Sequence, residues 1–214
     1  MTTLIDPKDR EIVDAFLRLY YDRGVWKDTF WLGVPALKCP LDLWVYQEVI
    51  FQVRPDVIIE CGTYEGGSAG FLASICDLLR RGRVITIDIE PRNARPKHKR
   101  VKYIRGSSTA TRTLQLVRRE VRPNDRVLVI LDSDHTKEHV LNEMRLYAPF
   151  VCVGSYLIVE DTCVNGNPLL PDFGPGPMEA VQEFLSERRD FEVDRSREKF
   201  FVTLNPSGWL RRVT

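Results

Sequence analysis

The chain has 214 residues, and 31 Lys and Arg residues against 30 Asp and Glu residues leave a formal net charge of +1. This near balance argues against a nucleic-acid partner that is bound through bulk charge. The five cysteines are scattered and form no C-x-x-C pair, which is typical of reduced thiols in the cytoplasm. Because no apolar signal region and no 18-residue apolar run occurs, we expect a cytoplasmic protein without a membrane span.

The first 55 residues predict a helical cap. Apolar residues recur at helical spacing over residues 8 to 23, and Pro40 opens a second helical pattern that runs to about residue 53. Between these helices, three aromatic residues could line an acceptor site or pack in a core or an oligomer interface: Trp26, Phe30 and Trp31. These aromatics lead us to expect a homodimer or a higher homo-oligomer.

From Asp56 onward, short apolar runs alternate with longer amphipathic segments. The runs predict strands at residues 57–60, 84–88, 101–104, 127–131 and 156–159, and the segments predict helices near 67–80, 109–121, 136–148 and 177–189. This alternation is typical of an α/β, doubly wound, Rossmann-like sheet. The tail predicts an antiparallel pair of strands, at residues 191–194 and 199–204, that finishes the sheet. We therefore expect a single domain with its core at residues 56–204.

Ligands of such sheets bind beyond the carboxyl ends of the strands. The first core strand leads into Glu60-Cys-Gly-Thr-Tyr-Glu-Gly-Gly-Ser68, whose glycines allow close approach to a ligand before a helix N-terminus. Asp88 ends the second strand and could accept hydrogen bonds from both ribose hydroxyls. Ser107 and Ser108 follow the third strand, beside an expected adenine position. These residues favour a nucleoside-type cofactor, although a tight turn and a surface carboxylate would also explain them.

The fourth and fifth strands both end in acidic residues, namely Asp132, Asp134, Glu160 and Asp161. Three carboxylates in one small volume repel one another unless a hard divalent cation such as Mg²⁺ neutralises them. The acids could instead cap the helices that follow. We favour a metal site built from Asp132, Glu160 and Asp161, and Asp134 fits either role.

The residues after the fourth strand also permit a zinc site. His135, Glu138 and His139 match the H-x-x-E-H pattern of inverted zinc peptidases. Such sites need both histidines well inside a helix, whereas His135 lies just beyond the sheet. The remaining histidine, His98, lies in a basic loop at residues 92 to 102 that we interpret as solvated. We therefore favour Mg²⁺ and expect His139 to be an ordinary polar helix residue.

Together these motifs resemble the cephalosporin-hydroxylase-like and rhamnosyl O-methyltransferase family of class I S-adenosylmethionine-dependent methyltransferases, over roughly residues 30 to 190. The resemblance also includes the run Trp31-Leu-Gly-Val-Pro-Ala-Leu-Lys-Cys-Pro-Leu-Asp42. It implies that S-adenosylmethionine is bound by Glu60, Gly62, Tyr64, Gly66, Ser68, Asp88, Ser107, Ser108 and Asp132. It also implies that Mg²⁺ is bound by Asp132, Glu160 and Asp161.

The metal-dependent catechol enzymes carry a catalytic Lys three residues after the first metal acid, and this chain has His135 there. A sugar hydroxyl must lose its proton as it attacks the sulfonium methyl group. We therefore assign His135 as the general base. The expected activity is Mg²⁺-dependent methyl transfer to a hydroxyl of a sugar or glycoside, with a mannose- or rhamnose-containing glycan as the candidate acceptor.

Two other functions stay open at this point. An NAD-dependent oxidoreductase could use a similar sheet, but the first turn lacks the G-x-G-x-x-G pattern. A non-catalytic cofactor-binding domain could also keep this fold, although the intact acids and His135 argue against it. The Pro- and Gly-rich segment from Cys163 to Pro177 fits either an acceptor-binding lid or a plain irregular loop.

Overall fold

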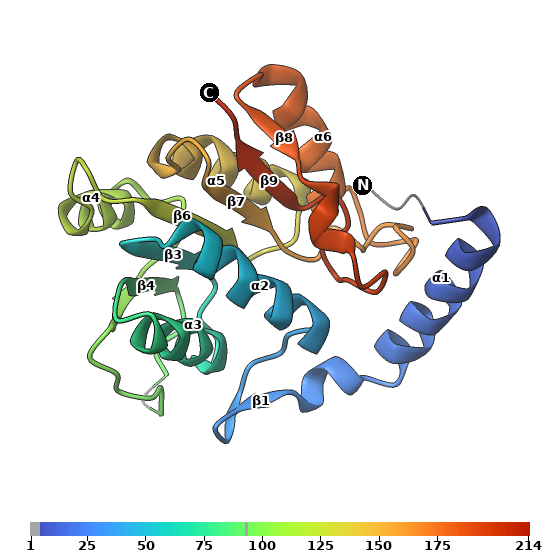
Figure 1. The fold of residues 1–214 in the computed structure, drawn as a ribbon, viewed down its shortest axis with the longest axis horizontal. Coiled ribbons are helices and arrows are strands. Elements are labelled where there is room, and N and C mark those ends of the chain that lie inside the picture. Colours follow the sequence, from blue (N-terminus) through green and yellow to red (C-terminus); the bar gives the residue numbers. More distant parts are fainter. Residues whose placement is uncertain (1–4, 93) are drawn as a thin grey trace.

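The computed structural model describes residues 5–92 and 94–214. Its centre is a seven-stranded sheet with the order β5-β4-β3-β6-β7-β9-β8 (Figure 1). The parallel strands are β3 (Val57–Cys61), β4 (Arg83–Asp88), β5 (Val101–Arg105), β6 (Val127–Leu131) and β7 (Tyr156–Val159). β9 (Trp209–Arg212) runs antiparallel to β7 and to β8 (Phe191–Val193). The predicted α/β sheet, mostly parallel with an antiparallel C-terminal strand, is confirmed.

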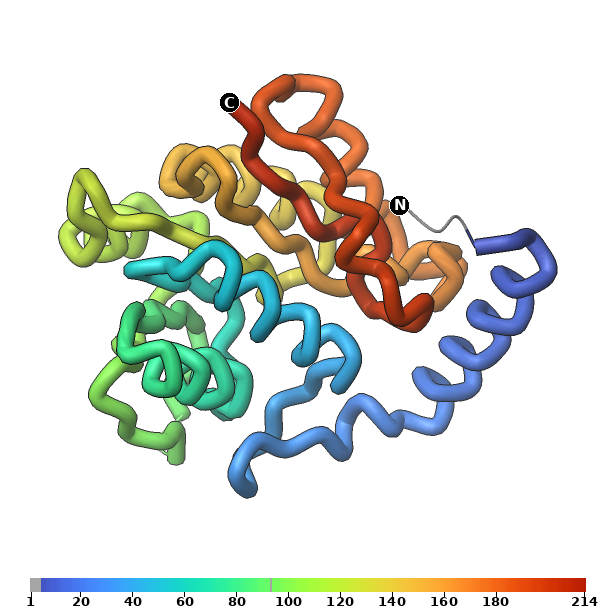
Figure 2. Tube along the Cα trace, viewed as in Figure 1, coloured from blue at the N-terminus to red at the C-terminus, as the bar shows by residue number. Residues whose placement is uncertain are grey.

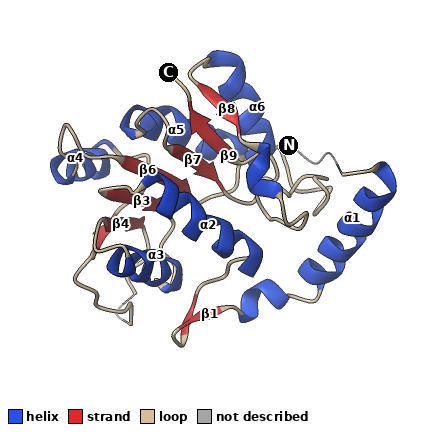
Figure 3. Ribbon diagram, viewed as in Figure 1, coloured by secondary structure: helices blue, strands red, loops and turns tan. Residues whose placement is uncertain are grey.

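The central strands are apolar along their whole length because helices cover both faces of the sheet. All five residues of β3 and all five of β6 are buried. On one face, Ile58 of β3 packs in a cluster with α2 (Pro40–Val53) and α3 (Gly67–Leu78). On the other face, Val57 and Ile59 join a cluster with three helices, α4 (Thr111–Glu120), α5 (Lys137–Tyr147) and α6 (Pro177–Glu187). Figure 3 shows this layering of helices around the strands.

The strand register brings the carboxyl ends of the strands to one edge of the sheet. Cys61 of β3 pairs with Ile87 of β4 and with Leu131 of β6. Leu131 in turn pairs with Val159 of β7. The residues that follow these strands therefore begin at the same level, and this level is where the predicted site residues lie.

The N-terminal segment runs along the outside of the molecule before it reaches the sheet (Figure 2). α1 (Pro7–Asp22) begins after Asp6, whose side chain accepts a hydrogen bond of 2.9 Å from Lys8 N. The chain then forms η1 (Val25–Asp28) and a small hairpin of β1 (Phe30–Trp31) and β2 (Val34–Pro35). α1 buries Leu17 in a cluster with residues of the segment after β7. None of the described helices is long and apolar enough to cross a membrane.

The predicted strand at residues 199–204 is wrong. This segment follows η3 (Arg195–Glu198) as a turn, and the last strand of the sheet is β9, beyond residue 204. The buried carboxylate of Asp42 on α2 accepts hydrogen bonds from Thr203 Oγ1, at 2.6 Å, and from Leu204 N, at 2.9 Å. A side chain distant in sequence therefore takes the polar groups that a neighbouring strand would have bonded.

Candidate active site

A cavity of about 660 Å³ opens at the carboxyl ends of the parallel strands. Nine residues predicted for the site line it: Gly62, Tyr64, Ser68, Asp88, Ser107, Ser108, Asp132, His135 and Asp161. Three other predicted residues do not line it: Glu60, Gly66 and Glu160. Most of the predicted residues therefore lie around one cavity at the edge of the sheet, and three lie outside its wall.

The glycine-rich turn passes very close to the end of β6. Gly62 has a φ of +95°, and a Cβ atom at this position would lie 1.8 Å from the carbonyl oxygen of Asp132. The backbones are joined here, because Asp132 N donates to Cys61 O at 2.8 Å. Gly62 thus allows the cofactor turn and the first metal acid to lie side by side.

Four donors of the protein itself bind the carboxylate of Asp88. Its Oδ2 accepts hydrogen bonds from Thr63 N at 3.1 Å, from Tyr64 N at 2.8 Å and from Arg95 Nη2 at 2.9 Å. Its Oδ1 accepts a hydrogen bond of 2.8 Å from Glu90 N. In this structure Asp88 therefore holds the glycine-rich turn in place, and no oxygen is left without a protein donor.

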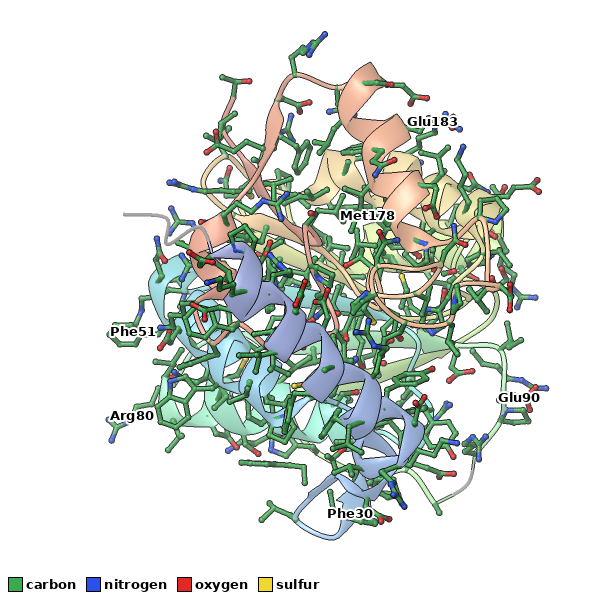
Figure 4. The ribbon with its side chains drawn as sticks, turned by 90° about the vertical axis from the view of Figure 1, so that its right-hand side faces the viewer. Phe30, Phe51, Arg80, Glu90, Met178 and Glu183 are labelled. Carbon is green, nitrogen blue, oxygen red and sulfur yellow. The ribbon has the colours of Figure 1, made fainter. Side chains whose placement is uncertain are left out.

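Two residues near Asp88 escaped the sequence analysis. Arg95 belongs to the basic loop that we expected to be solvated, but its side chain is only 9% exposed because it binds Asp88 and the carbonyl oxygen of Tyr64. Glu90 is exposed and lines the cavity, and Figure 4 places it at the outer edge of the molecule. Glu90 is therefore a second carboxylate that lines the cavity, two residues after Asp88.

His139 is part of the cavity wall, so the expectation of an ordinary helix residue is wrong. Its Nε2 lies 3.2 Å from Ser108 Oγ and 3.2 Å from Ser133 Oγ. Ser133 Oγ also donates to Oε1 of the buried Glu143 at 2.7 Å. The hydrogen bond to Glu143 raises the pKa of His139. This network fixes the serine side of the cavity, where we expected the adenine.

Asp132, His135 and Asp161 face one another across the cavity. One possible ligand atom from each lies within 4.8 Å of the others, and His135 Nε2 is 3.2 Å from Asp161 Oδ2. Burial raises the pKa values of both carboxyls, although Lys38 opposes this for Asp132 and His135 opposes it for Asp161. Two half-buried carboxylates, with water to complete the shell, are a donor set that suits Mg²⁺, so the residues present fit the predicted ion.

Glu160, which was predicted as a third metal ligand, is not part of this trio. Its side chain is 4% exposed, and its Oε1 accepts hydrogen bonds from Lys38 Nζ and Tyr46 Oη, both at 2.6 Å. Lys38 Nζ also donates to Asp132 Oδ2. Lys38 and Tyr46 were not predicted because neither follows a strand of the seven-stranded sheet, although Lys38 lies in the run from Trp31 to Asp42 that contributed to the resemblance.

Glu60 supports the turn from below and does not reach the cavity. It is fully buried, and its Oε2 accepts a hydrogen bond of 2.6 Å from Thr86 Oγ1. Thr86 Oγ1 lies 2.6 Å from Thr63 Oγ1 in the turn. Burial raises the pKa of Glu60 to about 7. The predicted contact of Glu60 with the cofactor is therefore replaced by an indirect role through the two threonines.

The zinc motif is not assembled as a site. Among the described residues, the group that could hold a metal contains His135 but neither Glu138 nor His139. Asp134 is exposed, and its Oδ1 accepts a hydrogen bond of 2.8 Å from Thr136 N at the start of α5. Asp134 is thus outside the metal-binding group, and it does not cap α5 either, because Thr136 is the N-cap residue and Asp134 binds the N–H of Thr136 itself.

Apolar and aromatic side chains also line the cavity. Tyr21 and Trp26 are among them and stack with their ring centroids 5.4 Å apart. Leu170 and Phe173, from the Pro- and Gly-rich segment after β7, line the cavity as well. The other two aromatics of the N-terminal segment lie elsewhere: Trp31 packs on Phe71 at 4.9 Å, and Phe30 is 56% exposed at the periphery of the molecule (Figure 4).

Comparison with known proteins agrees with this geometry. The family described as Rhamnosyl O-methyltransferase/CmcI matches residues 23–213. The chain is 36% identical over 208 residues to the rhamnosyl O-methyltransferase of Mycobacterium tuberculosis (strain ATCC 25618 / H37Rv), covering 94% of this chain and 85% of that protein. It is 37% identical over 207 residues to the corresponding enzyme of Mycobacterium leprae (strain TN), covering 94% and 90%.

Among solved structures, the fold is similar to that of CmcI bound to Mg and S-adenosylmethionine. The TM-score is 0.67 at 22% identity, over 88% of this chain and 78% of that one. The fold expected for a class I methyltransferase is thereby confirmed, and so is the resemblance derived from the motifs. The chain belongs to the Rhamnosyl O-methyltransferase/CmcI family and is an O-methyltransferase.

Proposed function

We propose that this O-methyltransferase transfers a methyl group from S-adenosylmethionine to a hydroxyl of a rhamnoside or a related glycoside, with Mg²⁺ bound at the active site. The observation that carries the proposal is the position of the trio formed by Asp132, His135 and Asp161. These residues line the same cavity as the glycine-rich turn and the aromatic side chains. A methyl donor and an acceptor hydroxyl could therefore meet beside the imidazole.

The cofactor would lie along the turn from Gly62 to Ser68, with its carboxylate near Ser68 and the N-terminus of α3. Ser107 and Ser108 line the adenine end. Because the carboxylate of Asp88 is taken up by protein donors, we assign Glu90 as the acid that accepts hydrogen bonds from the ribose hydroxyls. Asp88 would act on the cofactor through the turn that it holds.

His135 would take the proton of the acceptor hydroxyl at Nδ1, the ring nitrogen that does not face Asp161, while the hydroxyl oxygen attacks the methyl group and the sulfur–methyl bond breaks to leave S-adenosylhomocysteine. The imidazolium that forms is stabilised by Asp161, whose Oδ2 lies 3.2 Å from Nε2. Asp132 and Asp161 would hold Mg²⁺, which when bound supplies positive charge next to the developing negative charge on the acceptor. Tyr21, Trp26 and Phe173 offer aromatic surface to the apolar face of a sugar ring.

Methyl transfer from labelled S-adenosylmethionine to rhamnosides, mannosides and phenols tests the proposal directly. We expect transfer to a rhamnoside or mannoside that stops in chelator and returns with Mg²⁺. His135→Gln should lower turnover by roughly 100-fold or more and leave the binding of S-adenosylhomocysteine unchanged. His98→Gln, on the basic loop, is the matched control and should behave as the wild type. Undiminished transfer in chelator would contradict the metal site, and transfer to phenols alone would contradict the acceptor.

We also propose that the chain self-associates. Large apolar side chains are exposed on two helices: Ile12, Phe16 and Leu19 on α1, and Trp44 and Phe51 on α2. Exposed apolar area of this kind is typical of surfaces covered by a partner. Light scattering behind gel filtration measures the mass in solution, and a monomer at all concentrations would contradict this proposal.

A further inference from the structure

Lys38 is a buried cation at the rear of the active site. The residue is 3% exposed, and its ammonium group donates to Asp132 Oδ2 and, at 2.6 Å, to Glu160 Oε1. Its backbone is fixed as well, because Lys38 N donates to Thr29 Oγ1 at 3.0 Å. Lys38 therefore joins the N-terminal segment to the ends of both β6 and β7.

The ammonium group reaches the acids from behind the cavity. Lys38 does not line the large cavity, and together with Glu160 and Tyr46 it lines a separate void of about 10 Å³. A void of this size holds at most one water molecule. The surrounding side chains are buried, including Leu72 and Ile130. The lysine side chain thus has no free space beside it into which it could swing.

The ammonium group of Lys38 lies between two acids at this side of the site. It donates to one carboxylate oxygen of Asp132 and to one of the buried Glu160. Tyr46 adds a second donor to the same Glu160 oxygen at 2.6 Å. Removing one partner from such a buried group leaves an uncompensated charge and is strongly destabilising.

We propose that Lys38 is a permanent positioning residue of the metal site, which holds Asp132 and Glu160 from behind whether or not a divalent ion is bound. Its bond to Oδ2 leaves the other oxygen of Asp132, with Asp161, to bind the ion. The identity of the ion rests on the proposed function, but the contact of Lys38 with the two acids does not. The opposing possibility is that the ammonium group only fills the position of the ion and leaves when the ion binds.

Thermal unfolding of metal-stripped protein gives the first test, which needs no methyl transfer. We expect Lys38→Met to lower Tm by roughly 10 °C. The double variant Lys38→Met/Glu160→Gln should recover part of that loss, because one orphaned charge is gone. Lys102→Met is the control, since Lys102 pairs with Glu120 on the surface. If Lys38→Met does not fold, the Tm values of Lys38→Gln and of the double variant are compared with that of the wild type. An unchanged Tm of Lys38→Met would overturn the proposal.

Activity and metal affinity give the second test. At saturating Mg²⁺ we expect Lys38→Met to lower kcat by roughly 10-fold or more, because Asp132 loses its fixed position. The Kd for S-adenosylhomocysteine and the KM for S-adenosylmethionine should stay near the wild-type values, and calorimetry should show a Kd for Mg²⁺ that is unchanged or raised. Tighter Mg²⁺ binding with a wild-type kcat would show that Lys38 only fills the position of the ion. If the enzyme shows no Mg²⁺-dependent transfer at all, the Tm comparison still tests whether Lys38 holds the two acids in the metal-free protein, and the Kd for Mg²⁺ tests whether it competes with the ion.

Discussion

The cofactor end and the metal end of the cavity are built in different ways. At the cofactor end, Gly62 and Ser107 come shortly after the strands that position them, and the carboxylate of Asp88 at the end of β4 is held by neighbouring N–H groups. At the metal end, Lys38 contacts Asp132 across 94 residues of sequence and Glu160 across 122. The first region depends on turn geometry and strand register, whereas the second depends on the balance of buried charges from distant segments.

The largest effect is expected from a change confined to the metal end. Asp161→Asn removes a proposed metal ligand and the ionic partner of His135, so we expect methyl transfer to fall by roughly 1000-fold. Binding of S-adenosylhomocysteine, measured by calorimetry, should be preserved because the turn is untouched. Asp9→Asn is the control, since Asp9 is exposed in the first turn of α1 and does not line the cavity. Loss of cofactor binding in Asp161→Asn would show that the two ends are not separable.

A change at Gly62 should damage both ends together. Gly62→Ala puts a Cβ atom 1.8 Å from the carbonyl oxygen of Asp132, at a φ of +95°. We expect a loss of about 3 kcal/mol or more in the free energy of unfolding, measured with urea. Gly70→Ala, on α3 with its nearest neighbour at 3.6 Å, should be neutral or stabilising by up to about 1 kcal/mol. Equal stability of the two variants would contradict the close approach of the turn to β6.

The buried carboxyl group of Glu60 makes the stability of the folded protein depend on pH. Burial raises its pKa from 4.5 to about 7, so folding favours the protonated acid. Its contribution to stability is complete below pH 4.5 and is lost as the pH rises through 7. Glu60→Gln does not titrate. We therefore expect it to match the wild type near pH 4.5 and to exceed it at pH 8 by about 3 kcal/mol.

Urea unfolding across this range of pH measures the difference. Glu192→Gln, at an exposed position of β8, is the control and should follow the wild-type profile. A Glu60→Gln variant that is less stable than the wild type at pH 8 would mean that the charged form of Glu60 is stabilised in the folded protein, against the expectation from its burial.

A smaller effect should separate the two carboxylates at the ribose position. We expect Glu90→Ala to weaken S-adenosylhomocysteine binding by roughly 10-fold without a change in Tm, because it removes only contacts with the ligand. Asp88→Asn should lower Tm as well as affinity, since Asp88 holds the turn together with Arg95. If Glu90→Ala binds normally, the ribose contact belongs to Asp88, as the motif first predicted.

The smallest effect concerns the aromatic side chains of the cavity. Trp26→Ala should raise the KM for the sugar acceptor by roughly 5-fold and leave the KM for S-adenosylmethionine unchanged. Trp44→Ala is the control, because Trp44 is exposed on α2 and hydrogen-bonded to Glu48 at 3.1 Å. An unchanged acceptor KM in Trp26→Ala would place the sugar elsewhere in the cavity.

The local sequence was sufficient to predict a structural element wherever burial and strand direction determine that element. Apolar runs such as Val57–Cys61 and Val127–Leu131 can only be central parallel strands once helices alternate with them, and their register then places the next residue at the cavity. The same reasoning predicted a strand at residues 199–204, and this prediction is wrong. The apolar residues there resemble a strand, but Thr203 Oγ1 and Leu204 N donate hydrogen bonds to Asp42 on α2.

The sequence by itself therefore determined the sheet, the cofactor turn and the presence of acids at the ends of β6 and β7. Only the tertiary structure decided which way each carboxylate points and which group balances it. Glu160 binds Lys38, Asp88 binds Arg95, and His139 forms part of the cavity wall. The physical reason is that the backbone pattern is a local property. The partner of a buried charge comes instead from whichever distant segment packs beside it.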